Sequence, residues 1–279
     1  MTQKKSNRNL SRRAPPNLNS IRDLILEAAD AAGKVLRKHF RGKLKVAEKP
    51  GAGLVTNADL EAQEKIVKIL RAGLPKFGFL TEEAKPEAAQ CPGRWIIDPL
   101  DGTTNFIHGF PMFCVSIAAE WDHQMIAGTI YHPILDESYL AVRGKGASLN
   151  GKKLLVSQTT QISHALFTTS LSHQKGPRLQ HERTTCEELS HRARAVRRPG
   201  SAALDLAYTA AGVFDAFWGQ NLSLWDVAAG SLLVQEAGGK ISHFGDNLIK
   251  QENQAILASN SLLHKKLLHN LTAKKPLPF

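Results

Sequence analysis

The feature that most constrains this chain is a twelve-residue stretch, Trp95 to Phe106, which reads Trp-Ile-Ile-Asp-Pro-Leu-Asp-Gly-Thr-Thr-Asn-Phe. Its first three residues form a short apolar run, which is typical of a buried strand. The Asp-Pro-Leu-Asp-Gly segment then predicts a tight turn, because proline lacks a backbone donor and glycine tolerates unusual dihedral angles. The chain is therefore expected to hold two carboxylates, Asp98 and Asp101, at the end of a buried strand.

Hydrogen-bond donors follow these two acids directly. Thr103, Thr104 and Asn105 supply hydroxyls, an amide and, if a helix starts here, free backbone N–H groups that can bind an anion. Carboxylates bind hard cations, and metal-assisted phosphoryl chemistry needs both kinds of group side by side. A lone Asp-Gly-Thr would more simply be a capped strand-to-helix turn, but the complete stretch favours a cation and phosphate site.

Three more acids lie near predicted element ends. Glu82 follows the apolar segment 77–80, a predicted strand, and becomes a candidate metal ligand beside Asp98 and Asp101. Asp226 follows Trp225 at a predicted helix start, where a first-turn acid is the simpler interpretation. Asp59 lies in the first turn of another predicted helix, where acids commonly complement the helix dipole. Ala228, Ala229 and Gly230 predict close packing of the helix after Asp226.

Composition limits the class of protein. The formal net charge is +11, and most of the excess is at the two ends, in a set with no acid among them: Lys4, Lys5, Arg8, Arg12, Arg13, Lys265, Lys266, Lys274 and Lys275. Such ends are either solvated tails, the simpler interpretation, or contacts for nucleic acid or another anionic partner. Three widely spaced cysteines without a C-x-x-C pair indicate a reducing, cytoplasmic setting. No run of 18 apolar residues exists, so no membrane span is expected.

The pattern of elements predicts a mixed α/β fold. Residues 1–18 are basic and polar and are predicted to be a disordered tail. Residues 19–152 are predicted to form an α+β domain of two helices and a largely antiparallel sheet, which carries most of the metal ligands. In residues 153–279 strands alternate with helices, which indicates an α/β domain that supplies Asp226 and the substrate pocket.

Several of these motifs together resemble the inositol monophosphatase family of Mg²⁺-dependent, lithium-sensitive phosphatases. The similarity covers Ser20 to Leu271. It rests on matched blocks in the family's order: Leu54–Asp59, Thr81–Glu83, Trp95–Phe106, Gly200–Ala203 and Trp225–Gly230, with Glu236–Gly239 after the last. The resemblance implies a layered αβαβα sandwich with the site between its halves, and by analogy a homodimer.

The resemblance also implies roles for individual residues. Glu82, Asp98, Asp101, Asp226 and the carbonyl of Leu100 would hold two or three Mg²⁺ ions. Thr103, polarised by Asp59, would help to activate the attacking water, with Glu82 beside them. The phosphate and substrate positions would be Gly102, Thr103, Gly200, Ser201 and Ala202.

The substrate is the open point. Inositol-processing members carry a substrate-binding glutamate at the position that is Gly219 here, next to Gln220 and Asn221. Thr104, by contrast, favours the branch that acts on inositol phosphate-like sugar or polyol phosphates. The alternatives are phosphatases of the same superfamily that act on fructose 1,6-bisphosphate, histidinol phosphate or a nucleotide 3′-phosphate.

Two readings from other classes remain open as well. A haloacid dehalogenase-type phosphatase would place its two aspartates two residues apart, whereas Asp98 and Asp101 are three apart. Some bacterial members of the resembled family act in transcription complexes, and the basic ends suit an RNA-associated factor with weak phosphatase activity. No aromatic-interleaved basic motif in the sequence supports this second alternative.

Overall fold

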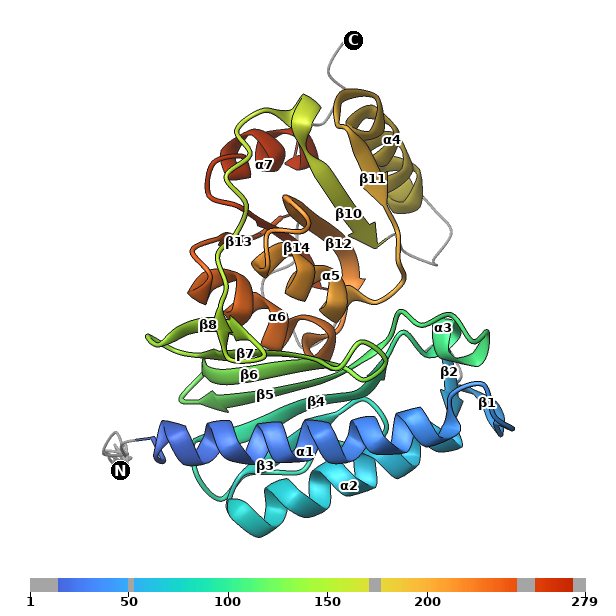
Figure 1. Ribbon diagram of the computed structural model, residues 1–279, viewed down its shortest axis with the longest axis vertical. Helices are drawn as coiled ribbons and strands as arrows, with labels where there is room; N and C mark the ends of the chain where they lie inside the picture. Colours follow the sequence, from blue (N-terminus) through green and yellow to red (C-terminus); the bar gives the residue numbers. More distant parts are fainter. Residues whose placement is uncertain (1–14, 50–52, 171–176, 245–253, 273–279) are drawn as a thin grey trace, which may run out of the picture.

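The structure is a computed structural model that describes residues 15–49, 53–170, 177–244 and 254–272. Its elements stack in the order helix, sheet, helix, sheet, helix, which Figure 1 shows from bottom to top. The predicted α/β class and layered sandwich are thus confirmed. Within the four described ranges, every helix is too short or too polar to cross a membrane.

The first layer consists of α1 (Leu18–His39) and α2 (Asn57–Gly73), which pack on each other and on the larger sheet. The buried side of α1 repeats apolar residues at three- and four-residue steps. The helix is capped by Asn17, whose side chain accepts the Asn19 N–H at 2.9 Å. Of the predicted tail, residues 1–14 lie outside the described residues.

The larger sheet has seven strands in sequence order, and only its first pair is parallel. The antiparallel prediction for this half is confirmed, and the predicted boundary at residue 152 falls in the last strand. The strands are β3 (Gly78–Thr81), β4 (Gly93–Asp101), β5 (Cys114–Trp121), β6 (Gln124–His132), β7 (Glu137–Val142), β8 (Gly146–Leu149) and β9 (Lys152–Lys153).

Two helices fill the layer between the sheets: α5 (Ala202–Ala210) and α6 (Leu224–Glu236). A Cβ added to Gly230 of α6 would lie 2.5 Å from Leu206 Cβ of α5. A Cβ added to Gly128 of β6 would lie 2.9 Å from Ala229 Cα. The predicted close packing of this helix is therefore confirmed, and small residues are what allow it.

The second sheet has five strands in the order β11-β10-β12-β14-β13, parallel around β10 and antiparallel around β14. Its outer face is covered by α7 (His264–Thr272), with α4 (Pro177–Arg192) beside β11. A short 3₁₀ turn, Ile162–His164, leads into the sheet. The strands are β10 (Leu166–Ser170), β11 (Ala195–Arg197), β12 (Ala216–Leu222), β13 (Lys240–His243) and β14 (Gln254–Ser259).

A two-stranded hairpin precedes α2. In it β1 (Val46–Lys49) pairs antiparallel with β2 (Gly53–Thr56). Lys49 lies opposite Gly53 at the end of this ladder. The base of the hairpin is tied to α2, because the Lys45 N–H donates to Asn57 Oδ1 at 2.8 Å and the Asn57 N–H to the Lys45 carbonyl at 3.2 Å.

Candidate metal and phosphate site

The site starts at an irregularity of β4. The strand does not stop after Ile97 as predicted but runs on to Asp101, and its register with β5 slips between Asp98 and Asp101. In a regular strand, residues three apart point to opposite faces. The slip therefore allows both carboxylates to serve one region. Asp98 is 2% exposed, and its Oδ1 accepts the Leu100 N–H at 2.9 Å.

Gly102 turns the chain from β4 into the short helix α3 (Thr103–Ile107). Its φ is 97°, and an added Cβ would lie 2.8 Å from the Met112 carbonyl oxygen, so only glycine fits this turn. The turn brings the Thr103 hydroxyl back over the strand end, where it lies 3.0 Å from the Leu100 carbonyl oxygen. The predicted ligand carbonyl and the predicted catalytic hydroxyl are thus neighbours.

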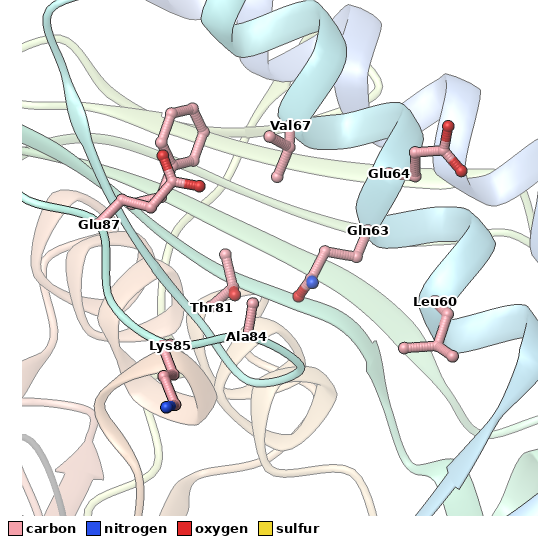
Figure 2. A pocket seen from close by; sticks show the side chains of 9 residues that line it. Leu60, Gln63, Glu64, Val67, Thr81, Ala84, Lys85 and Glu87 are labelled. Atoms are coloured by element: carbon pink, nitrogen blue, oxygen red, sulfur yellow. The ribbon is translucent and has the colours of Figure 1, made fainter.

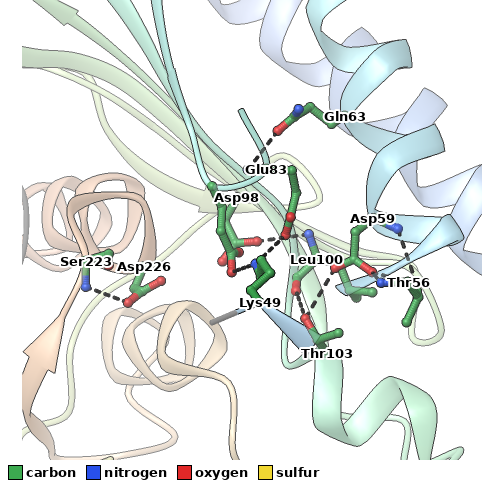
Figure 3. Close-up of polar contacts among 11 residues, drawn as sticks. Lys49, Thr56, Asp59, Gln63, Glu83, Asp98, Leu100, Thr103, Ser223 and Asp226 are labelled. Carbon is green, nitrogen blue, oxygen red and sulfur yellow. Dashed lines mark hydrogen bonds and ion pairs between the residues drawn. The ribbon is translucent and has the colours of Figure 1, made fainter. Parts of the chain in front are cut away.

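Asp59, which belongs to the first helix layer, contacts Thr103. It is fully buried at the start of α2, and its Oδ1 lies 3.3 Å from Thr103 Oγ1 (Figure 3). Its Oδ2 accepts the Thr56 hydroxyl at 2.6 Å and the Thr56 N–H at 2.8 Å. Burial raises the pKa of Asp59, although the bonds from Thr56 oppose that shift. The carboxylate is therefore fixed in one orientation towards the Thr103 hydroxyl.

Glu82 follows β3 at the same end of the sheet, because β3 and β4 run parallel and end together. Its N–H donates to the Ile97 carbonyl at 3.2 Å. The Lys49 ammonium from the β1–β2 hairpin lies 2.8 Å from both Glu82 Oε1 and Glu83 Oε1. Figure 3 shows its contact with Glu83. Burial raises the pKa of Glu82, and Lys49 opposes that shift.

Asp101 is bound by the N-terminus of α5, which lies between the two sheets. Asp101 Oδ2 accepts the Ser201 hydroxyl and the Ala203 N–H, each at 2.7 Å, at the N-terminus of α5. The Asn105 amide of α3 donates to the Pro199 carbonyl at 2.8 Å, which joins α3 to the turn at Gly200. Burial raises the pKa of Asp101 to about 6, against the opposing effect of these bonds.

Asp226 reaches the same region from the first turn of α6. Its Oδ2 accepts the Ser223 N–H at 2.7 Å (Figure 3). Burial raises its pKa well above the ordinary range, and repulsion from Asp101 and Glu82 adds to the shift. Burial likewise raises the pKa of Asp98, with repulsion from Glu82, Asp101 and Asp226. Four acids on three separate elements therefore act electrostatically on one another.

These acids fit a divalent cation by their chemistry. Buried like charges destabilise each other unless a cation compensates them, and oxygen donors are what Mg²⁺ prefers. In the described part of the chain, no three acidic, histidine or cysteine side chains are drawn together as a complete set of ligands. The Glu82 carboxylate is instead turned to the Lys49 ammonium. A cation would therefore have to draw the carboxylates closer together.

The structure adds neighbours that the sequence did not assign to the site. Glu83 shares Lys49, the Ala203 N–H binds Asp101, and the buried Cys114 thiol lies 4.0 Å from Asp101 Oδ2. A hollow of about 190 Å³ lies between α2 on one side and β3 with the segment after it on the other, as Figure 2 shows. Gln63 lines it, and its Oε1 accepts the Glu83 N–H at 3.2 Å. These contacts join residues that lie far apart in the chain, so the spacing of apolar residues could not predict them.

Comparison with known proteins identifies the family. Residues 17–275 match the model of the inositol monophosphatase family. The chain belongs to the inositol monophosphatase family. It is 40% identical over 265 residues to an inositol-1-monophosphatase of Mesorhizobium japonicum, which covers 92% of this chain and 97% of that protein. It is 38% identical over 261 residues to the Nus factor SuhB of Pseudomonas aeruginosa, covering 91% and 96%.

A solved structure agrees with this membership. The extragenic suppressor protein suhB of Bartonella henselae superposes with a TM-score of 0.87 at 38% identity, covering 92% of this chain and all of that one. The sequence-based recognition is confirmed. This inositol monophosphatase family member is a phosphoric monoester hydrolase, and the family's chemistry is Mg²⁺-dependent.

Proposed function

We propose that this chain hydrolyses a small phosphomonoester with Mg²⁺, and that Glu82, Asp98, Asp101 and Asp226 hold the metal. The observation that carries this is the convergence of one buried and three half-buried carboxylates from β4, the turn after β3 and the start of α6. When bound, Mg²⁺ lowers the pKa of a water and neutralises charge on the phosphoryl group. We infer two or three ions, with the Leu100 carbonyl as a further ligand.

The remaining residues position the reactants. Asp59 accepts a hydrogen bond from the Thr103 hydroxyl, which can then orient the attacking water and help remove its proton. The N–H groups of Gly102 and Thr103 start α3, where they can donate to phosphate oxygens. Gly200, Ser201 and Ala202 form the opposite wall, and the Ser201 hydroxyl fixes Asp101. Water attacks directly, so the enzyme forms no covalent bond to the phosphoryl group.

We infer that the substrate is an inositol 1-phosphate-like sugar or polyol phosphate. The relative from Mesorhizobium japonicum carries the name inositol-1-monophosphatase, which supports this class. Gly219 counts against inositol 1-phosphate itself. A Cβ there would lie 2.9 Å from Leu222 Cδ1 and 3.1 Å from Phe217 Cζ, so packing leaves no room for a glutamate. The alcohol must be recognised by other groups.

The test is a panel of phosphate esters with Mg²⁺, with and without Li⁺. It contains inositol 1-phosphate, fructose 1,6-bisphosphate, histidinol phosphate, adenosine 3′,5′-bisphosphate and β-glycerophosphate. We expect Mg²⁺-dependent phosphate release, inhibition by Li⁺, and nearly complete loss in Asp98→Asn, because a buried ligand loses its charge. Full activity of Asp98→Asn on every ester would show that the metal assignment is wrong. A trapped aspartyl-phosphate would support the haloacid dehalogenase alternative.

A second function is favoured by one relative's name, Nus factor SuhB. The basic ends of this chain would suit contact with RNA or with the transcription machinery. Filter binding of RNA at two salt concentrations tests it, and salt-insensitive or absent binding would rule RNA out. We also propose a homodimer, which light scattering after size-exclusion chromatography tests.

A further inference from the structure

We propose that Lys49 is an internal cation that neutralises Glu82 until a divalent cation takes that carboxylate, and that Glu83 then keeps the displaced ammonium. The inference rests on the proposed metal site and adds two residues to it. Glu83 becomes a positioning residue, which acts through Lys49 and binds no metal. The hairpin that carries Lys49 becomes a part of the site that responds to metal binding.

The first observation is the shared ammonium. Lys49 Nζ lies 2.8 Å from one oxygen of Glu82 and 2.8 Å from one oxygen of Glu83. The ammonium therefore faces two carboxylates at hydrogen-bond distance, an arrangement that favours its charged form. One ammonium bridging two carboxylates can leave one of them without becoming unpaired.

The second observation is the difference between the two glutamates. The Glu83 side chain is 2% exposed, against 19% for Glu82. The Glu82 N–H donates to the Ile97 carbonyl, next to Asp98 in β4, which places Glu82 on the side of the proposed metal ligands. The Glu83 N–H donates instead to Gln63 of α2. Leaving Glu83 without a cation would bury an unpaired charge, which is costly. Lys49 is therefore expected to stay with Glu83 and to give up Glu82.

The third observation is that Lys49 and Glu83 differ in how freely they can move. Gln63 accepts the Glu83 N–H, so the backbone at Glu83 is anchored to α2. The rest of β1, Val46 to Glu48, is exposed, while the base of the hairpin is tied at Lys45 and Asn57. Lys49 can thus shift by a few torsions without disturbing a packed core, whereas Glu83 remains in place.

The experiment measures Mg²⁺ affinity by isothermal titration calorimetry, which needs no turnover. Lys49→Met removes the competing charge and keeps the length of the side chain, so Mg²⁺ should bind about fivefold to tenfold more tightly. Lys49→Arg keeps the charge and should not tighten binding. Lys45→Met, an exposed lysine of the same hairpin, is the matched control and should leave the affinity within about twofold.

The Glu83→Gln variant distinguishes movement of the Lys49 ammonium to Glu83 from the general loss of a negative charge near the metal. In the native background it should weaken Mg²⁺ binding, because the displaced ammonium has lost its second carboxylate. In the Lys49→Met background the same change should have little effect, since no ammonium has to be moved. Equal weakening in both backgrounds would overturn the role of Glu83. Circular dichroism and thermal unfolding of each variant check that it folds.

Failure of this inference and failure of the proposed function look different. If the native protein binds no Mg²⁺, both are wrong. If it binds Mg²⁺ but Lys49→Met leaves the affinity unchanged or weaker, the metal site stands and the competing role of Lys49 is wrong. Hydrogen exchange at residues 46–49 and 53–56 adds a second readout. We expect the exchange rates to change on addition of Mg²⁺ in the native protein but not in Lys49→Met.

Discussion

Asp59 and Asp226 occupy the same local position, yet the balance of electrostatic effects around them differs. Each is the third residue of a helix, and each accepts the N–H of the residue that caps it, Thr56 or Ser223. Burial raises the pKa of both. At Asp59 the next largest effect is the hydrogen bonds from Thr56, which oppose the rise and outweigh repulsion from Glu82. At Asp226 the next largest effect is repulsion from Asp101 and Glu82, which adds to the rise and outweighs the bond from Ser223.

The difference shows that a capping motif fixes where a carboxylate lies but not what it does. Asp59 faces hydroxyl donors and is suited to orient Thr103. Asp226 faces other acids and is suited to bind a cation. Its neighbours arrive from β3 and β4, more than a hundred residues earlier in the chain. Whether an acid in the first turn of a helix is suited to bind a cation therefore depends on the charged groups that tertiary packing places around it.

The largest effect is expected for Asp226→Asn. The amide oxygen can still accept the Ser223 N–H, but the metal loses a charged ligand, so kcat/KM should fall about 10³-fold. Without metal the variant should melt about 2 °C or more higher than the native protein, because a buried repulsion is gone. Phosphate release and thermal unfolding with and without Mg²⁺ measure both. A lower metal-free Tm would contradict the description of Asp226 as repelled.

Asp59→Asn should reduce kcat by about 10²-fold or more, since the group that polarises Thr103 loses its charge. Its effect on stability should have the opposite sign to that of Asp226→Asn. An amide oxygen can still accept from Thr56, but these bonds lose their charge assistance, so the metal-free Tm should fall. Steady-state kinetics and unfolding scans provide the comparison. If both asparagine variants shift Tm in the same direction, the contrast between the two acids is wrong.

Thr103→Val should lower kcat about 10- to 100-fold, because the hydroxyl between Asp59 and the Leu100 carbonyl is lost. Thr103→Ser keeps the hydroxyl and is the matched control. Mg²⁺ affinity measured by calorimetry should be nearly equal in the two variants. A Thr103→Val enzyme as active as Thr103→Ser would remove Thr103, and with it Asp59, from the catalytic assignment.

The smallest effect is expected for Thr56→Ala. It removes the hydroxyl that donates to Asp59 at 2.6 Å and accepts the Ala58 N–H at 3.1 Å. Such a cap contributes about 1 kcal/mol, measured as the free energy of unfolding in urea. Thr56→Ser should remain within about 0.5 kcal/mol of the native protein. No loss in Thr56→Ala would mean that Asp59 is held in place by its burial alone.

Much of the fold could be predicted, because periodic burial leaves a clear record in sequence. The face of α1 and the strands of the larger sheet followed from apolar spacing. The β1–β2 hairpin did not, since β1 is charged and exposed and its pairing shows no alternation of apolar residues. The apolar run that contains β12 begins at Val213, but the strand starts only at Ala216. Backbone bonds to the Tyr208 carbonyl hold Val213 and Phe214 in the turn after α5, and apolar spacing does not reveal such bonds.

The site divides in the same way. Asp98, Asp101 and Glu82 were recognisable because each follows an apolar run that predicts a strand, and the ends of neighbouring parallel strands meet at one edge of a sheet. The length of β4 could not be predicted. The register shift between Asp98 and Asp101 depends on pairing with β5, which residues 95–106 do not encode by themselves. The contact of Lys49 with Glu83 joins residues 34 positions apart, each of them an ordinary surface type by sequence.

The position of α6 between the two sheets has a consequence for how the protein matures. Its body packs against both sheets, while its first turn carries Asp226 to the carboxylates of the other half. A partly synthesised chain that ends before residue 224 contains every strand of the larger sheet, yet it lacks this proposed ligand. Newly made protein should therefore acquire full affinity for Mg²⁺ only after the whole sandwich has closed, so that cation uptake marks the completion of folding.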